Sequence, residues 1–112
     1  MLDVDGTLIP YRYDALPSEK VKETIALAKQ KVHVCLVTGR SYYSSKSILK
    51  ALGLTEGYAV VDTGAFVIDI ANNEIVYKQT KEMTDILHVI HVFEKNNVIF
   101  YLKDEKNIAK VS

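Results

Sequence analysis

Short apolar runs that alternate with helix-like segments constrain the fold of this chain most. Three runs have the composition of buried strands: Met1–Val4, Val32–Val37 and Tyr58–Asp62. Helical segments separate them, from Ser18 to about Lys31 and from Ser41 to about Gly53, and each begins at a serine that can cap a helix. The order strand–helix–strand–helix–strand predicts an α/β fold with a parallel sheet and right-handed crossovers.

The later part of the chain has a different pattern. Two pairs of β-rich segments predict hairpins: Ala65–Ile70 with Glu74–Lys78, turning at Asn72-Asn73, and Val98–Lys103 with Asn107–Val111, turning at Asp104-Glu105. A helix is expected between the hairpins, from about Glu82 to Lys95. Its apolar residues form one stripe: Met83, Ile86, Leu87, Ile90 and Phe93.

Composition excludes several classes of protein. With 14 basic and 14 acidic residues among 112, the chain has no net charge to attract nucleic acid or an anionic membrane. No apolar run approaches the roughly 18 residues of a membrane span. The single cysteine, Cys35, excludes an internal disulfide and favours a reducing compartment. We therefore expect a cytoplasmic protein without nucleic-acid or membrane partners, and its oligomeric state stays open.

Polar residues follow each of the three predicted strands. Asp3 and Asp5 lie at the end of the first, Thr38 follows the second, and Thr63 follows the third. In parallel α/β sheets, ligands bind where the carboxyl ends of strands meet the following loops. These residues are therefore expected at one edge of the sheet.

The strongest candidates for catalytic and metal-binding residues lie in the segment Asp3-Val4-Asp5-Gly6-Thr7. Two carboxylates at positions i and i+2 can lie close together, so one can ionise beside a cation while the other keeps a raised pKa. A carboxylate fixed beside Mg²⁺ can attack phosphorus and form an aspartyl-phosphate. Gly6 permits a sharp turn, which the Thr7 hydroxyl can hold by a local hydrogen bond.

Two other interpretations of this segment are weaker. A calcium loop of the EF-hand type would place Met1 at its first ligand position and Arg12 where its bidentate glutamate belongs, so it does not fit. A structural Asp-Gly turn is commoner in general, but the second acid and Thr7 favour a functional one.

A second turn with phosphate-binding chemistry follows the strand that ends at Val37. Thr38 offers a hydroxyl, and the Gly39 amide can approach an oxyanion without a side chain in the way. The helix that begins near Ser41 adds oriented amides. Arg40 could bind phosphate bidentately or pair with a surface carboxylate.

With these motifs in order, the chain resembles the haloacid dehalogenase (HAD) superfamily, in particular its Cof-type or IIB sugar-phosphatase-like branch. Asp3-Val4-Asp5-Gly6-Thr7-Leu8 resembles the first motif, and Val37-Thr38-Gly39-Arg40 the second. Asp62-Thr63-Gly64-Ala65 resembles the Asn-Gly-Ala segment that precedes a short hairpin, with Thr63 in place of the usual asparagine. The resemblance implies a three-layer Rossmann-like core, Mg²⁺ as cofactor, and hydrolysis of phosphomonoesters.

The resemblance also implies roles for individual residues. Asp3 would be the nucleophile and a metal ligand, and Asp5 would be the general acid and base and give the metal its backbone carbonyl. The implied phosphate- and substrate-binding residues are Gly6, Thr7, Thr38, Gly39, Arg40, Thr63 and Gly64. Thr38 would hydrogen-bond the phosphoryl group.

By the same resemblance, residues 1–79 correspond to a partial catalytic core and residues 80–112 to the beginning of an α/β cap of the C2 type. Family members carry a lysine and an acidic cluster after the cap, and neither is found in these 112 residues. We therefore expect part of a longer protein, truncated at both ends and weakly active or inactive by itself.

The function expected from the sequence is Mg²⁺-dependent hydrolysis of small phosphorylated metabolites such as sugar phosphates. A phosphomutase of the same fold and a non-catalytic phosphate-binding module remain alternatives. His88 and His91 have a spacing that a metal site could use, although a solvated helix face is favoured. Tyr42 and Tyr43 either pack in a helix or stack on a sugar ring at the mouth of the site.

Overall fold

The structure is a computed structural model that describes residues 1–12, 14–104 and 108–111. The chain divides into two compact units, Met1–Gln79 and Thr80–Ser112. The first unit contains β1 (Leu2–Asp3), α1 (Glu19–Lys29), β2 (Leu36–Val37), α2 (Tyr42–Ala51), β3 (Tyr58–Val61), the 3₁₀ turn η1 (Asp62–Gly64), β4 (Phe66–Asp69) and β5 (Glu74–Lys78). The second contains α3 (Met83–Lys95), β6 (Phe100–Lys103) and β7 (Ile108–Val111).

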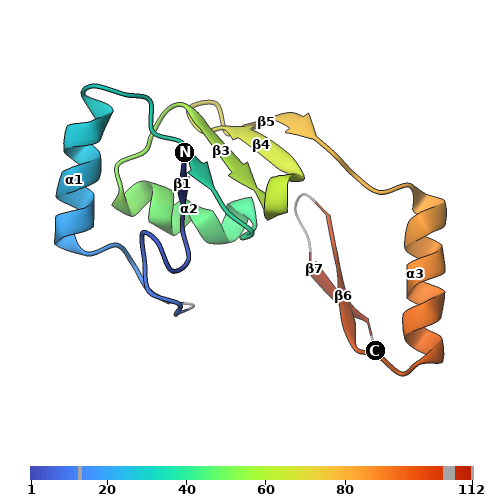
Figure 1. Ribbon diagram of the computed structural model, residues 1–112. Helices are drawn as coiled ribbons and strands as arrows, with labels where there is room; N and C mark the ends of the chain where they lie inside the picture. Colours follow the sequence, from blue (N-terminus) through green and yellow to red (C-terminus); the bar gives the residue numbers. More distant parts are fainter. Residues whose placement is uncertain (13, 105–107, 112) are drawn as a thin grey trace. The chain divides into compact units, whose positions relative to one another are not determined.

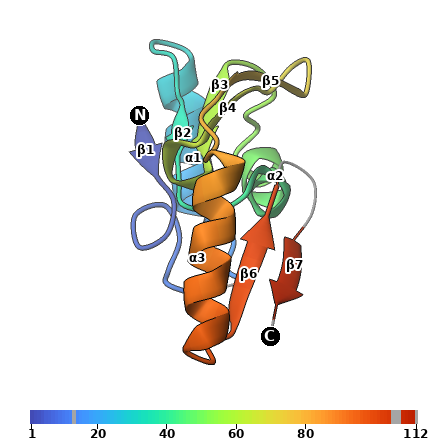
Figure 2. The same cartoon turned by 90° about the vertical axis from the view of Figure 1, so that its right-hand side faces the viewer.

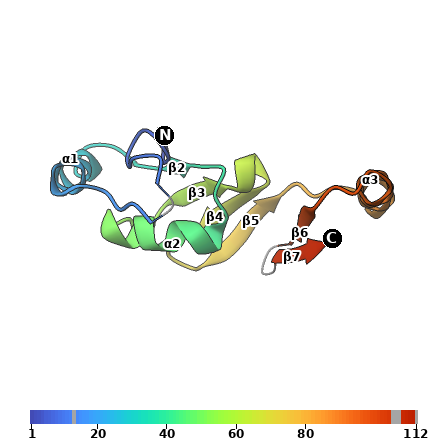
Figure 3. The same cartoon turned by 90° about the horizontal axis from the view of Figure 1, so that it is seen from below.

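The first unit is built on a five-stranded sheet in the order β1-β2-β3-β4-β5 (Figure 1). The first three strands are parallel, with Leu2 opposite Leu36 and Leu36 opposite Ala59. The last two strands are antiparallel additions, and β3, β4 and β5 lie side by side (Figure 3). The parallel α/β arrangement expected from the sequence is therefore confirmed, with a hairpin extending the sheet.

Both helices of this unit pack on one face of the sheet. Ile25 of α1 and Ile48 of α2 belong to the same buried cluster as Leu36 and Val61, which lie on the sheet. Alternate residues of β3 and β4 are buried, as expected for a sheet with one covered face. The described residues of this unit thus form two of the layers expected of a three-layer core.

The predicted helix starts are confirmed. The Ser18 hydroxyl accepts a hydrogen bond from the Val21 amide at 3.3 Å, and the Ser41 hydroxyl accepts one from the Ser44 amide at 3.1 Å. These bonds satisfy amides that the first helical turn leaves without a partner. The cap at Ser41 also fixes where the chain leaves the turn that contains Arg40.

The predicted buried strand Val32–Val37 is too long. Only Leu36 and Val37 form β2, while Val32 is 60% exposed. The neighbouring strand β1 begins to pair at Leu2, whose amide bonds to the Cys35 carbonyl at 2.9 Å. Residues 32–34 therefore have no ladder partner in β1, and the apolar composition alone does not make them a strand.

The second unit has the predicted helix and hairpin. Figure 2 shows β6 and β7 side by side, paired in antiparallel register. Glu105 and Asn107, which the sequence assigned to the hairpin turn and its second strand, lie outside the described residues. Part of the predicted apolar stripe of α3 is half-buried, and the rings of Phe93 and Phe100 meet edge to face at 5.1 Å.

The rest of that stripe differs from the expectation, because Met83 and Leu87 are exposed within this unit. The ring of Phe100 in the hairpin contacts that of Phe93 in α3, whereas Met83 and Leu87 remain exposed. In the part of the chain that the structure describes, no helix combines the length and apolarity that crossing a membrane would require.

Candidate active site

The acidic segment forms a tight turn at the end of β1. Val4 is fully buried, and its carbonyl accepts hydrogen bonds from the amides of Thr7 and Leu8 at 3.2 and 2.9 Å. Gly6 has a φ of 76°, a left-handed conformation that favours glycine. A Cβ at Gly6 would lie 2.3 Å from the ring of Tyr11, which is exposed and can move, so the backbone conformation is the main reason for glycine here.

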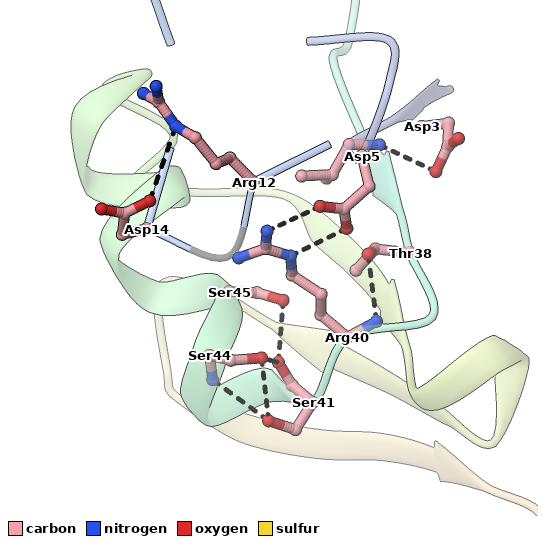
Figure 4. Close-up of polar contacts among 10 residues, drawn as sticks. Asp3, Asp5, Arg12, Asp14, Thr38, Arg40, Ser41, Ser44 and Ser45 are labelled. Atoms are coloured by element: carbon pink, nitrogen blue, oxygen red, sulfur yellow. Dashed lines mark hydrogen bonds and ion pairs between the residues drawn. The ribbon is translucent and has the colours of Figure 1, made fainter. Parts of the chain in front are cut away.

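Asp5 is held by an arginine from the next turn. Arg40 Nε donates to Asp5 Oδ2 at 2.8 Å and Arg40 Nη2 donates to Oδ1 at 2.6 Å, a bidentate pair (Figure 4). The Arg40 side chain is only 14% exposed and that of Asp5 32% exposed. The pair therefore lies in a partly desolvated position, where solvent screens its Coulombic attraction less than at the open surface.

Arg40 lowers the pKa of the Asp5 carboxyl. The hydrogen bond from Arg40 lowers the pKa of the Asp5 carboxyl, partial burial opposes it, and attraction to the arginine charge adds to the lowering. The sequence predicted a raised pKa for one carboxyl of the pair. For Asp5 that expectation is wrong in this arrangement, because its nearest charged neighbour is a cation.

Asp3 lies differently from the expectation. Its carboxylate is exposed and accepts a hydrogen bond from the Val4 amide at 2.8 Å. Figure 4 shows it directed away from the Asp5 carboxylate. The two acids therefore leave the same turn without converging in this conformation, and a rotation of the Asp3 side chain is needed to bring them together.

The turn after β2 has the predicted hydrogen-bonding residue at its base. Thr38 is buried, and its hydroxyl accepts a hydrogen bond from the Arg40 amide at 3.1 Å. Its own amide donates to the Val60 carbonyl of β3 at 2.9 Å. Thr38 thereby fixes the backbone from which the Arg40 side chain extends toward Asp5.

The turn after β3 is bonded to the turn after β2. The Asp62 amide donates to the Arg40 carbonyl at 2.8 Å, and the Thr63 amide donates to the Thr38 carbonyl at 3.2 Å. Asp62 and Thr63 have φ values of 51° and 56°, which reverses the chain directly after β3. The Thr63 hydroxyl lies 3.4 Å from where a Cβ at Gly39 would stand.

The structure therefore joins the turns after all three parallel strands. It brings together Asp5, Thr38 and Thr63, as the parallel-sheet argument predicted, with Arg40 and Gly39 between them. The Asp3 carboxylate, which the same argument included, is directed away. Gly64 completes the last turn with a φ of 92°. Thr7 is exposed at the rim of the first turn.

The sequence interpretation missed a groove next to Arg40. The groove has a volume of about 480 Å³ and is lined by residues of the segment after the acidic turn and by the first turns of α2. Tyr43 of the predicted Tyr42-Tyr43 pair lines it, together with Asp14, which the sequence had not singled out. The sequence signal that could have indicated the groove is Arg40, because this residue of the predicted site forms part of the groove wall.

The donor set for a metal fits Mg²⁺ in part. Asp3 offers an exposed carboxylate and Asp5 a backbone carbonyl, and Mg²⁺ commonly takes one or two carboxylates together with waters and substrate phosphate. Both oxygens of the Asp5 carboxylate are bonded to Arg40. Among the described residues there is no group of three or more His, Cys, Asp or Glu side chains placed to hold a metal, and His88 and His91 are exposed.

Comparisons with known proteins show the family to which this chain belongs. A family model described as haloacid dehalogenase-like hydrolase matches residues 1–111. The chain is 29% identical over 99 residues to the "Putative phosphatase" of Mycoplasma pneumoniae, an alignment that covers 85% of this chain and 34% of that protein. It is 30% identical over 105 residues to the "Putative phosphatase YkrA" of Bacillus subtilis, covering 91% of this chain and 38% of that protein.

Solved structures show the same fold. A haloacid dehalogenase-like hydrolase from Bacteroides thetaiotaomicron matches with a TM-score of 0.82 and 21% identity, over 97% of this chain and 41% of that one. A second, from B. subtilis, matches with a TM-score of 0.79 and 20% identity, over 96% of this chain and 36% of that one. The chain spans little more than a third of the curated relatives it matches. By the family model that covers almost its whole length, this chain belongs to the haloacid dehalogenase-like hydrolases.

Proposed function

We propose that the protein to which this chain belongs is a Mg²⁺-dependent phosphatase of the Cof-type branch, which hydrolyses small phosphorylated metabolites such as sugar phosphates in the cytoplasm. The observation that carries the proposal is the bidentate contact of Arg40 with Asp5 at the edge where three parallel strands end. It places a guanidinium, the residue type best suited to phosphate, beside the acidic turn. Both curated relatives also carry the word phosphatase in their names.

Phosphate recognition would use the turn after β2. A phosphoryl oxygen that approaches this turn meets the Arg40 guanidinium and the Thr38 hydroxyl, which are held on a common backbone. The phosphate competes with the Asp5 carboxylate for the same guanidinium N–H groups. Substrate binding is therefore expected to loosen the Asp5–Arg40 pair and to free the Asp5 carboxyl for proton transfer.

The hydrolysis would proceed in two steps. First, a carboxylate oxygen of Asp3 attacks phosphorus; the P–O bond to the leaving group breaks, and the leaving oxygen takes a proton from the Asp5 carboxyl. Then Asp5, now a carboxylate, accepts a proton from water as the water oxygen attacks the aspartyl-phosphate. This step releases inorganic phosphate and restores the Asp3 carboxylate.

Mg²⁺, held by the Asp3 carboxylate and the Asp5 carbonyl, would neutralise charge between the nucleophile and the phosphate. Arg40 has a second role in this scheme. Its contact favours the ionised form of Asp5 before substrate binds, so Asp5 can act as the acid only after the phosphate has drawn the arginine away and the carboxylate has taken up a proton from solvent.

Hydrolysis of p-nitrophenyl phosphate with and without Mg²⁺ tests the proposal. Asp3→Asn should reduce turnover at least a hundredfold, because an amide cannot act as the nucleophile. Asp85→Asn, an exposed position in the first turn of α3, is the matched control and should leave turnover unchanged. Equal activity of Asp3→Asn and the parent protein would refute the assignment of Asp3.

One observation favours a phosphate-binding function without turnover as a second candidate. Both oxygens of Asp5 are engaged by Arg40, and Asp3 is directed away from it. Calorimetric binding of inorganic phosphate by a protein that hydrolyses none of a panel of phosphomonoesters, with Mg²⁺ present, would support this candidate over the phosphatase.

A further inference from the structure

The groove beside Arg40 lies entirely within the first unit. Its lining on one side comes from the segment that follows the acidic turn, and on the other side from α2. The residues used below are Asp14, Leu16, Arg40, Tyr43, Lys46 and Ser47. Its volume of about 480 Å³ falls in the range of small-molecule sites, roughly 300–1,000 Å³.

Arg40 belongs to both the groove and the candidate active site. Its guanidinium bonds to Asp5, and the residue also forms part of the groove wall. A phosphate ester bound by Arg40 at the acidic turn therefore has the groove next to it. This groove is therefore the space nearest to Arg40 that the part of the substrate leaving after hydrolysis can occupy.

The lining is suited to a hydroxylated ring. Tyr43 is 85% exposed, so its flat face is open to a ligand, and Leu16 adds apolar surface from the other segment. Ser47 provides a hydroxyl and Asp14 a carboxylate that can accept hydrogen bonds from ligand hydroxyls. A flat aromatic surface with hydrogen-bonding groups at its edge is the combination that binds sugar rings.

The charges of the groove lining favour a ligand that carries an anionic group. Asp14 already has Arg12 at 3.6 Å, so its negative charge is balanced locally. Lys46 lies with its ammonium 4.9 Å from the centre of the Tyr42 ring, and within the described ranges no carboxylate forms an ion pair with it. The groove therefore presents, in Lys46, a cation that no carboxylate of the described residues neutralises.

We propose that this groove binds the leaving group of the substrate and selects sugar phosphates that carry a second acidic group, either a carboxylate or a phosphate. Tyr43 stacks on the sugar ring, and Lys46 binds the acidic group. The proposal rests on the proposed function, because it takes the turn around Arg40 as the site of the transferred phosphate. It adds two residues of α2 that determine specificity.

Binding monitored by amide NMR tests the groove separately from the phosphate site. Three probes are titrated into the ¹⁵N-labelled chain with Mg²⁺: inorganic phosphate, glucose 6-phosphate and 6-phosphogluconate. Phosphate should shift the amides of residues 38–41 and leave those of Tyr43, Lys46 and Ser47 unchanged. The phosphorylated sugar acid should also shift those of Tyr43, Lys46 and Ser47, and bind about tenfold more tightly than glucose 6-phosphate. Fructose 1,6-bisphosphate, as a fourth probe, distinguishes a second phosphate from a carboxylate.

Two substitutions assign the preference to residues. Lys46→Gln should abolish the tenfold advantage of the acidic sugar and leave phosphate binding unchanged. Lys50→Gln, one turn further along the same helix and outside the lining, should retain it. Tyr43→Ala should weaken both sugar phosphates several-fold without affecting inorganic phosphate.

The outcomes separate the two proposals. Shifts confined to residues 38–41 with every probe, or equal affinity for the acidic and neutral sugars, would overturn the groove assignment. Shifts in the groove without any response at residues 38–41 would instead contradict the phosphatase proposal, because the phosphate would then lie elsewhere.

Discussion

Arg40 donates hydrogen bonds to both carboxylate oxygens of Asp5, at 2.8 and 2.6 Å, although the two residues are 35 positions apart in the sequence. The contact connects the turn after β1 to the turn after β2, so it is both a structural link and part of the candidate site. Its energetic contribution is measured by unfolding and its chemical role by turnover.

The pair should make stability depend on pH in the acidic range. Since the folded-state pKa of Asp5 is lowered, the pair stabilises the protein above the unfolded-state pKa, near 4, and this stabilisation is lost as the pH falls through the lower folded-state pKa. A double-mutant cycle with Asp5→Asn and Arg40→Gln should give a coupling of about 1 kcal/mol at pH 7. The coupling, measured by urea unfolding with a metal chelator present, should decrease as the pH falls below the unfolded-state pKa; a coupling that does not change with pH contradicts the assignment.

The turn at Gly6 should resist substitution for a reason of backbone geometry. Gly6→Ala places a side chain at a φ of 76°, which costs about 1–2 kcal/mol. The Tyr11 ring that meets the new Cβ is exposed and can move. Adding Tyr11→Ala should therefore recover little of the lost unfolding free energy. Gly39→Ala is the control, because Gly39 has an ordinary φ and the new Cβ would lie 3.4 Å from its nearest neighbour, the Thr63 hydroxyl. This substitution should lower the unfolding free energy by less than about 0.5 kcal/mol.

Thr38 should matter through its hydroxyl rather than its volume. Thr38→Val keeps the shape but removes the acceptor of the Arg40 amide, which should lower the unfolding free energy by about 1–2 kcal/mol. It should also weaken inorganic phosphate binding measured by calorimetry, because the turn that carries Arg40 loosens. Thr38→Ser retains the acceptor and should bind phosphate like the parent; equal phosphate binding by the valine variant would exclude a role for the hydroxyl.

The core beneath the site should be sensitive at α2. Ile48 is fully buried against the sheet, so Ile48→Ala should cost about 2–5 kcal/mol in chemical denaturation. Leu27 of α1 is 66% exposed, and Leu27→Ala should change the unfolding free energy by less than about 0.5 kcal/mol. Similar losses for the two variants would show that α2 does not pack as described.

Features fixed by local chemistry could be predicted from the sequence. The caps at Ser18 and Ser41 depend on neighbouring amides, and the glycine at position 6 follows from a turn that neighbouring residues define. The meeting of the turns that contain Asp5 and Thr38 could also be predicted. It follows from the parallel order of the strands, whatever the details of the side chains.

Features that depend on a distant partner could not be predicted in the same way. The composition of Val32–Val37 predicts a strand, but its length depends on where β1 starts to pair. The sequence left Arg40 with two possible partners, and its contact with Asp5 follows from side-chain directions that only the folded backbone sets. The direction of the Asp3 carboxylate is likewise a rotamer choice, which strand order does not determine.

The two backbone bonds between residues 38–40 and residues 62–63 have a consequence for how such a site can evolve. They place residue 63 by its peptide group, so the loop keeps its position whatever side chain stands there. Different side chains can therefore stand at position 63 without displacing Arg40. Ligand preference at this edge of the sheet can change by single substitutions, while the scaffold that carries them is inherited intact.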